Sequence, residues 1–188
     1  MDELIKMGKA NITKEIAYPL YAAISSDTGG FLFSSASATT YRRAAELIGT
    51  GIDFSDVNHR LFHSKSKEQI QAEGFIASKL KTRADGKIAY ATLSREERLN
   101  SGALQEHFET AIDVIRSLIF AEIALFVREN DDGTLKASIR STGANVAEIA
   151  AQFGGGGHVR AAGCSPKADS AEAGAELLLT RLEELFAN

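Results

Sequence analysis

A run of four glycines followed directly by a histidine is the part of the sequence whose residue types best suit chemistry. It lies within FGGGGHVRAAGCS, from Phe153 to Ser165. Glycine loses more backbone freedom on folding than any other residue, so four in a row are costly unless the backbone must approach something closely. Consecutive backbone N–H groups can form a concave anion site, and an imidazole at the rim adds a donor. We therefore predict that a phosphate or carboxylate binds at Gly155, Gly156, Gly157 and His158. A flexible linker is the alternative, but such linkers are usually rich in serine, and here the flanking segments are apolar.

An arginine in the segment ASIRST is the second candidate binding residue. The apolar residues Leu135, Ala137 and Ile139 alternate along a predicted strand, so Arg140 points to the opposite face. A guanidinium there is either solvated, paired, or a bidentate clamp for a phosphate. Ser141 follows it as a further hydrogen-bond donor.

Other reactive residue types have a simpler explanation. His59 and His63 are four residues apart on a predicted helix, but no glutamate accompanies them as in metalloproteases, so we expect a solvated or packing pair. Cys164 is expected to be a buried, inert thiol. Asp27, before Thr-Gly-Gly, is explained by its residue type alone as the cap of a turn.

The elements that must position these residues are helical first and mixed afterwards. Apolar spacing predicts helices over 2–25, 38–50 and from about 53, and a helical connector from 64 up to a turn at Ala84–Gly86. Strands are expected over 87–93, 121–130 and 134–141, the last two joined by Asp-Asp-Gly as a hairpin. Helices are expected over 102–118, over 145–153 with Gly143 or Asn145 as N-cap, and over 170–186 with four leucines on one side. This order predicts an α/β fold with a mixed sheet.

Composition limits the class of protein. The 188 residues are 44% apolar and 24% charged, as in an ordinary globular protein, and no apolar window long enough to span a membrane occurs. A net charge of −4 disfavours binding of long duplex nucleic acid but leaves room for a short phosphate ligand. The single cysteine fits a reducing, cytoplasmic location.

Taken together, SIRS, a helix and FGGGGHVRAAGCS resemble the DHH-associated domain of the DHH phosphoesterases. The similarity is to the nanoRNase and 3′-phosphoadenosine-5′-phosphate phosphatase group. Upstream, LYAAISSDTGGFLFSS is similar to the end of the catalytic DHH domain. The resemblance implies that 1–58 is the C-terminal part of the DHH domain, 59–84 a helical linker, and 85–188 the substrate-binding domain.

The same resemblance implies a chemistry. Family members hold two divalent metals, usually manganese, and Asp27 matches one metal ligand. Arg140, Ser141 and the Gly155–His158 segment match the positions that grip the nucleotide, and Arg116 is a further candidate lining the cleft. The implied partners are short RNA oligonucleotides or nucleotides, with a homodimer possible and no membrane.

The sequence departs from the family because it contains no DHH tripeptide. One aspartate cannot hold two metals, so we expect a truncated form that lacks most metal ligands and is inactive by itself. There are two alternatives to a truncated nanoRNase-like phosphoesterase. One is a non-catalytic nucleotide-binding module, and the other is a relative of the cyclic-di-AMP or linear-dinucleotide phosphodiesterases.

Overall fold

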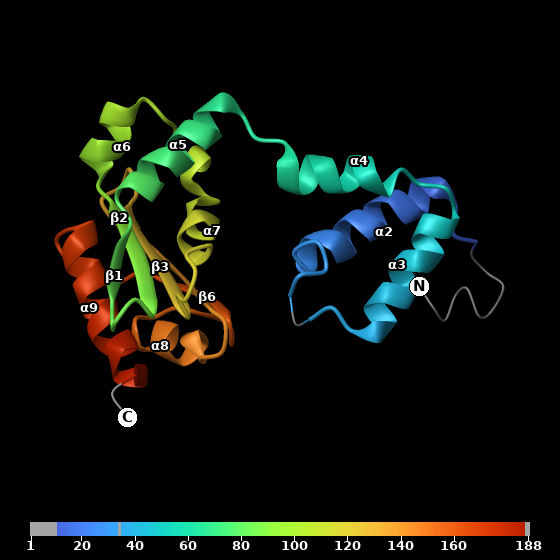
Figure 1. The fold of residues 1–188 in the computed structure, drawn as a ribbon. Coiled ribbons are helices and arrows are strands. Elements are labelled where there is room, and N and C mark those ends of the chain that lie inside the picture. The colour runs from blue at the N-terminus through green and yellow to red at the C-terminus, as the bar shows by residue number, and fades with distance from the viewer. Residues whose placement is uncertain (1–10, 34, 187–188) are drawn as a thin grey trace. The chain divides into compact units, whose positions relative to one another are not determined.

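The computed structural model describes residues 11–33 and 35–186, and the chain forms two compact units that divide between Lys65 and Ser66 (Figure 1). The described part of the first unit is helical, as predicted. Its elements are α2 (Lys14–Asp27), α3 (Ala38–Gly49), α4 (Phe54–Asn58) and a π-helical turn (His59–His63). Residues 2–10 of the first predicted helix lie outside the described residues.

Local side chains explain where these helices begin. Ser37 and Thr40 form a reciprocal capping box at the start of α3, and the Asp53 carboxylate accepts the Asp56 N–H at 3.0 Å before α4. The three helices bury a small core in which Tyr21, Leu47 and Val57 are at most 4% exposed. The first unit therefore has a core of its own.

The second unit is built on a six-stranded mixed sheet, as the predicted fold class requires. Its strands are β1 (Lys81–Arg83), β2 (Ile88–Leu93), β3 (Ile123–Glu129), β4 (Leu135–Ser141), β5 (Gly156–His158) and β6 (Ala161–Cys164), in the spatial order β1-β2-β3-β4-β6-β5. Only β2 and β3 pair in parallel, and the other four pairings are antiparallel.

Helices cover the two faces of this sheet unequally. One face, with Leu125 and Ile139, is buried by α8 (Val146–Gln152) and α9 (Ala171–Glu183). The other is buried over β2 and β3 by α5 (Lys67–Ser78) and α7 (Ala111–Arg116), and Figure 1 shows α7 and α9 on opposite sides of the strands. The strand residues of this second cluster come from β2 and β3, and none comes from β4, β5 or β6.

Three predicted elements are corrected by the structure. The single helix expected over 102–118 is wrong: α6 (Arg95–Ser101) ends at Gly102 in the left-handed conformation, a 3₁₀ turn covers Gln105–Phe108, and α7 begins at Ala111. The connector expected to be helical up to the turn at Ala84–Gly86 is helical only to Ser78 and continues as β1, which pairs with β2; the turn itself is present. Of the four leucines expected on one side of the last helix, Leu178 and Leu182 are buried, but Leu177 and Leu185 are exposed, and α9 ends at Glu183, before Leu185.

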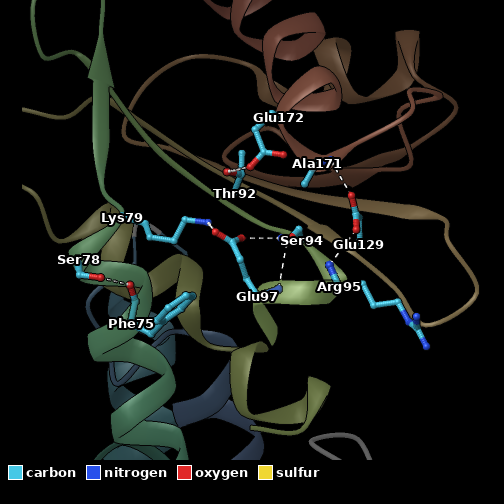
Figure 2. A network of polar contacts seen from close by, with 10 residues as sticks. All are labelled: Phe75, Ser78, Lys79, Thr92, Ser94, Arg95, Glu97, Glu129, Ala171 and Glu172. Atoms are coloured by element: carbon cyan, nitrogen blue, oxygen red, sulfur yellow. Dashed lines mark hydrogen bonds and ion pairs between the residues drawn. The ribbon is translucent and has the colours of Figure 1, made fainter. Parts of the chain in front are cut away.

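A polar network joins the helices to one end of the sheet (Figure 2). The Glu129 carboxylate, at the end of β3, accepts the backbone N–H of Arg95 at 2.8 Å and that of Ala171 at 3.2 Å. Glu129 therefore binds the first residues of both α6 and α9. Lys79, just after α5, pairs with Glu97 of α6.

Candidate functional site

An open groove of about 660 Å³ lies against the half of the sheet that α5 and α7 leave uncovered. Its lining includes side chains and backbone of β4, β5 and β6, together with Glu109. Four of the predicted binding residues, Arg140, Gly155, Gly156 and His158, line this groove.

Strand register brings Arg140 and His158 together. Arg140 of β4 pairs with Ala161 of β6, and Ala161 pairs in turn with His158 of β5. Residues directly opposite each other in neighbouring strands project to the same face. The guanidinium and the imidazole therefore rise from one row of the sheet, with only the small Ala161 side chain between them.

Arg140 has no carboxylate partner in the part of the chain that the structure describes. Its Nη1 donates to the neighbouring Ile139 carbonyl oxygen at 3.0 Å. Burial lowers the pKa of its guanidinium, the Asp113 carboxylate opposes this, and the positive charge of Arg116 adds to it. A half-buried cation that makes no direct ion pair with a described carboxylate is costly, so an anion in the groove would be bound favourably.

Most of the glycine run is explained by the fold itself. Gly154, with a φ of +71°, and Gly155 donate to the carbonyls of Ala151 and Ala150 and so close the C-terminus of α8 as a Schellman motif. A Cβ on Gly155 would lie 2.1 Å from the Gly163 carbonyl oxygen, and one on Gly157 2.5 Å from that of Ala161. These glycines allow β5 to approach β6.

Gly156 is the exception. A Cβ there would meet nothing within 4 Å, its backbone needs no glycine conformation, and it shares the groove face with His158. The expectation that the consecutive backbone N–H groups form a concave anion site is corrected accordingly: the run is exposed, two of its N–H groups are used by the helix end, and Gly156–His158 forms an edge strand.

Three of the predicted binding residues do not line the groove, namely Gly157, Ser141 and Arg116. Ser141 has the parity of Ile139, so its side chain points away from Arg140, and its hydroxyl oxygen accepts the N–H groups of Gly143 and Ala144 at 3.0 and 2.7 Å. Arg116 does not line the groove, but its charge acts on Arg140, and it lies 3.5 Å from Asp113. The turn after β4 therefore uses Ser141 structurally.

Other groove residues were not predicted. Lys136 and Ser138 lie four and two positions before Arg140 on the same face of β4, so strand alternation was the signal that could have found them. Glu109 gave no such signal, because only folding brings it to Lys136, 3.5 Å away, and to Arg128.

Comparison with known proteins identifies the second unit. Residues 85–188 match the model of the DHHA1 domain. The chain belongs to the DHHA1 domain family. This match and the relatives described next confirm the predicted resemblance to nanoRNase-like members of the DHH family.

Those relatives are longer proteins. The chain is 31% identical over 183 residues to the bifunctional oligoribonuclease and PAP phosphatase NrnA of Thermus thermophilus, covering 97% of this chain and 54% of that one. To the protein of the same name from Bacillus subtilis it is 26% identical over 166 residues, covering 87% and 52%. The chain thus spans about half the length of the curated relatives it matches.

One solved structure is similar over almost the whole chain. An exopolyphosphatase-related protein from Bacteroides fragilis superposes with a TM-score of 0.86 at 27% identity, covering 98% of this chain and 56% of that one.

The described residues beside the DHHA1 domain do not fit a manganese site. Asp27 is exposed at the end of α2, and within 11–33 and 35–186 no three His, Cys, Asp or Glu side chains gather as metal ligands would. A divalent cation takes several oxygen or nitrogen ligands, so the single carboxylate of Asp27 is insufficient. No bond-breaking step is therefore assigned to these residues.

The remaining reactive side chains have structural environments. The rings of His59 and His63 have centroids 6.4 Å apart, and His59 Nδ1 lies 3.0 Å from the Ser64 hydroxyl. Burial raises the pKa of the Cys164 thiol to about 11, which keeps it protonated and unreactive at neutral pH. Among the described helices, none is long and apolar enough to cross a membrane.

Proposed function

We propose that this chain is the substrate-holding part of a DHH-family phosphoesterase that acts on short oligoribonucleotides, with 3′-phosphoadenosine-5′-phosphate as a second substrate. The observation that carries the proposal is Arg140, a half-buried guanidinium without a carboxylate partner among the described residues, in one row with His158. The printed names of the relatives, oligoribonuclease and PAP phosphatase, support the substrate class.

In this proposal, Arg140 and His158 hold a phosphate while Gly156 leaves room for it against the strand. Arg140 gives charge-assisted, bidentate hydrogen bonds, and the imidazole gives one more. We propose metal-dependent hydrolysis for the whole enzyme and not for this chain alone, because the described residues do not include a set of metal ligands. We keep manganese, a cytoplasmic location and a homodimer as predictions.

A non-catalytic nucleotide-binding module is the second candidate, and the missing cluster of metal ligands among the described residues favours it. A hydrolysis assay on a dinucleotide with added manganese separates the two. We expect the purified 188-residue chain to bind without turnover. Measured turnover would contradict our assignment of binding alone to these residues.

Titration with AMP tests the binding site directly. Arg140→Ala and His158→Ala should each weaken binding at least about tenfold, because each removes a hydrogen bond to a charged group. Arg181→Ala is the matched control, since Arg181 pairs with Glu184 and lies on α9, which covers the opposite face of the sheet. Unchanged affinity in both groove variants would refute the proposed site.

A further inference from the structure

The groove contains a carboxylate that a site for phosphate alone does not explain. Glu109 follows the 3₁₀ turn Gln105–Phe108, lines the groove, and has a side chain that is 51% exposed. A negative charge repels phosphate, so the position of Glu109 beside Lys136, in the same groove as Arg140, calls for a separate reason.

Two cations fix this carboxylate in place. Its Oε1 accepts a hydrogen bond from the Arg128 guanidinium, and its Oε2 lies 3.5 Å from the Lys136 ammonium. Burial acts to raise the pKa of Glu109, but the hydrogen bond and charge of Arg128, with the charge of Lys136, outweigh it and hold the pKa below its usual value. Glu109 is therefore an ionised and oriented acceptor.

Neutralising Arg128 is the simplest role for Glu109, since Arg128 is only 3% exposed. That role accounts for Oε1 but not for the half of the side chain that remains exposed in the groove. An ionised carboxylate only accepts hydrogen bonds, so the matching group on a ligand must be a donor.

Ribose supplies such a donor on a nucleotide. Acidic side chains recognise ribose hydroxyls in dinucleotide sites, and the 2′-hydroxyl is what distinguishes RNA from DNA. We propose that Glu109 accepts a hydrogen bond from a ribose 2′-hydroxyl and thereby selects ribose over deoxyribose. This inference rests on the proposed function, namely that the groove binds a nucleotide phosphate at Arg140.

The spacing along β4 indicates which sugar is involved. Lys136, the neighbour of Glu109, lies four residues before Arg140 on the same strand face, roughly 14 Å away along the strand. This exceeds the span of one sugar–phosphate unit. The recognised ribose therefore belongs to the nucleotide next to the one whose phosphate contacts Arg140.

The experiment measures a ratio of affinities on the 188-residue chain. Calorimetric titration at fixed salt compares the diribonucleotide pApA with its deoxyribose counterpart, and AMP with dAMP. We expect the chain to bind pApA about tenfold more tightly than its deoxy counterpart, with little preference between AMP and dAMP. In Glu109→Gln the dinucleotide ratio should fall from about tenfold to about threefold, because the carboxamide oxygen can accept only a neutral hydrogen bond in place of the charge-assisted one.

The ratio stays informative if Glu109→Gln is partly unfolded, because an unfolded fraction lowers both affinities equally. Glu106→Gln, an exposed residue of the same 3₁₀ turn, is the control and should keep the ratio of the unaltered chain. Equal binding of the two dinucleotides, or a ratio that Glu109→Gln leaves unchanged, would overturn this inference alone. Failure of both dinucleotides to bind would overturn the proposed function and this inference with it.

Discussion

At the scale of single residues, the glycine run contains three glycines that the fold requires and one that it does not. Gly154, Gly155 and Gly157 close a helix or allow two strands to approach. Gly156 has none of these duties and faces the groove. A side chain at position 156 would therefore occupy the space of a ligand without disturbing the protein.

Substitution of adjacent glycines tests this separation. Gly156→Ala should raise the free energy of unfolding by up to about 1 kcal/mol, because alanine restricts the unfolded chain and its methyl group meets no neighbour. It should nevertheless weaken AMP binding severalfold, measured by titration. Gly155→Ala should cost about 3 kcal/mol or more in chemical denaturation, because its Cβ would overlap the Gly163 carbonyl oxygen. Full AMP affinity in folded Gly156→Ala would place the ligand elsewhere.

At the scale of elements, one carboxylate holds two helices on the end of β3. Glu129 accepts N–H groups from the first residues of α6 and α9, which would otherwise lack intrahelical partners (Figure 2). The negative charge also suits the positive ends of the two helix dipoles. The position of α9, which buries much of the larger core, therefore depends partly on Glu129.

Removal of this carboxylate should destabilise the second unit without altering the groove. Glu129→Ala should lower the free energy of unfolding by about 2 kcal/mol, since two charge-assisted hydrogen bonds are lost from a partly exposed site. Urea denaturation followed by circular dichroism measures it. Glu106→Ala, an exposed glutamate that should change stability by less than about 0.5 kcal/mol, is the comparison. A loss as small as that of Glu106→Ala would show that the two bonds contribute nothing.

At the scale of the whole molecule, the two units have separate cores. The buried cluster of the first unit draws its residues from 12–57, and those of the second unit draw theirs from 72–186. Every residue that lines the groove lies between Glu109 and Ser165. Binding should therefore be a property of the second unit.

A fragment that contains only residues 66–188 tests this expectation. It should fold cooperatively and bind AMP within about twofold of the 188-residue chain, because it retains both cores of its unit and the complete groove. Calorimetric titration of the two proteins under identical salt conditions makes the comparison. A folded fragment that binds at least tenfold more weakly would show that residues 1–65 contribute to the site.

The sequence by itself determined most of the helices and strands, and two of the candidate binding residues, Arg140 and His158. Near neighbours in the sequence encode the periodicity of the helices and their capping residues, such as Ser37 and Asp53. They also encode the hairpin before β4 and the strand alternation that directs Arg140 away from the apolar face. The glycine run beside His158 was equally visible. Family membership also followed, because these short motifs keep their order along the chain.

Only the tertiary structure decided the rest, because it depends on contacts between distant residues. Pairing through β6 places His158 beside Arg140, and close approach to the same strand explains Gly155 and Gly157. Folding also turns Ser141 into a cap for its own loop and brings Glu109 to the groove. Local sequence preferences do not specify which strands will pair or which carboxylate a distant cation will contact. These positions therefore could not be predicted from neighbouring residues alone.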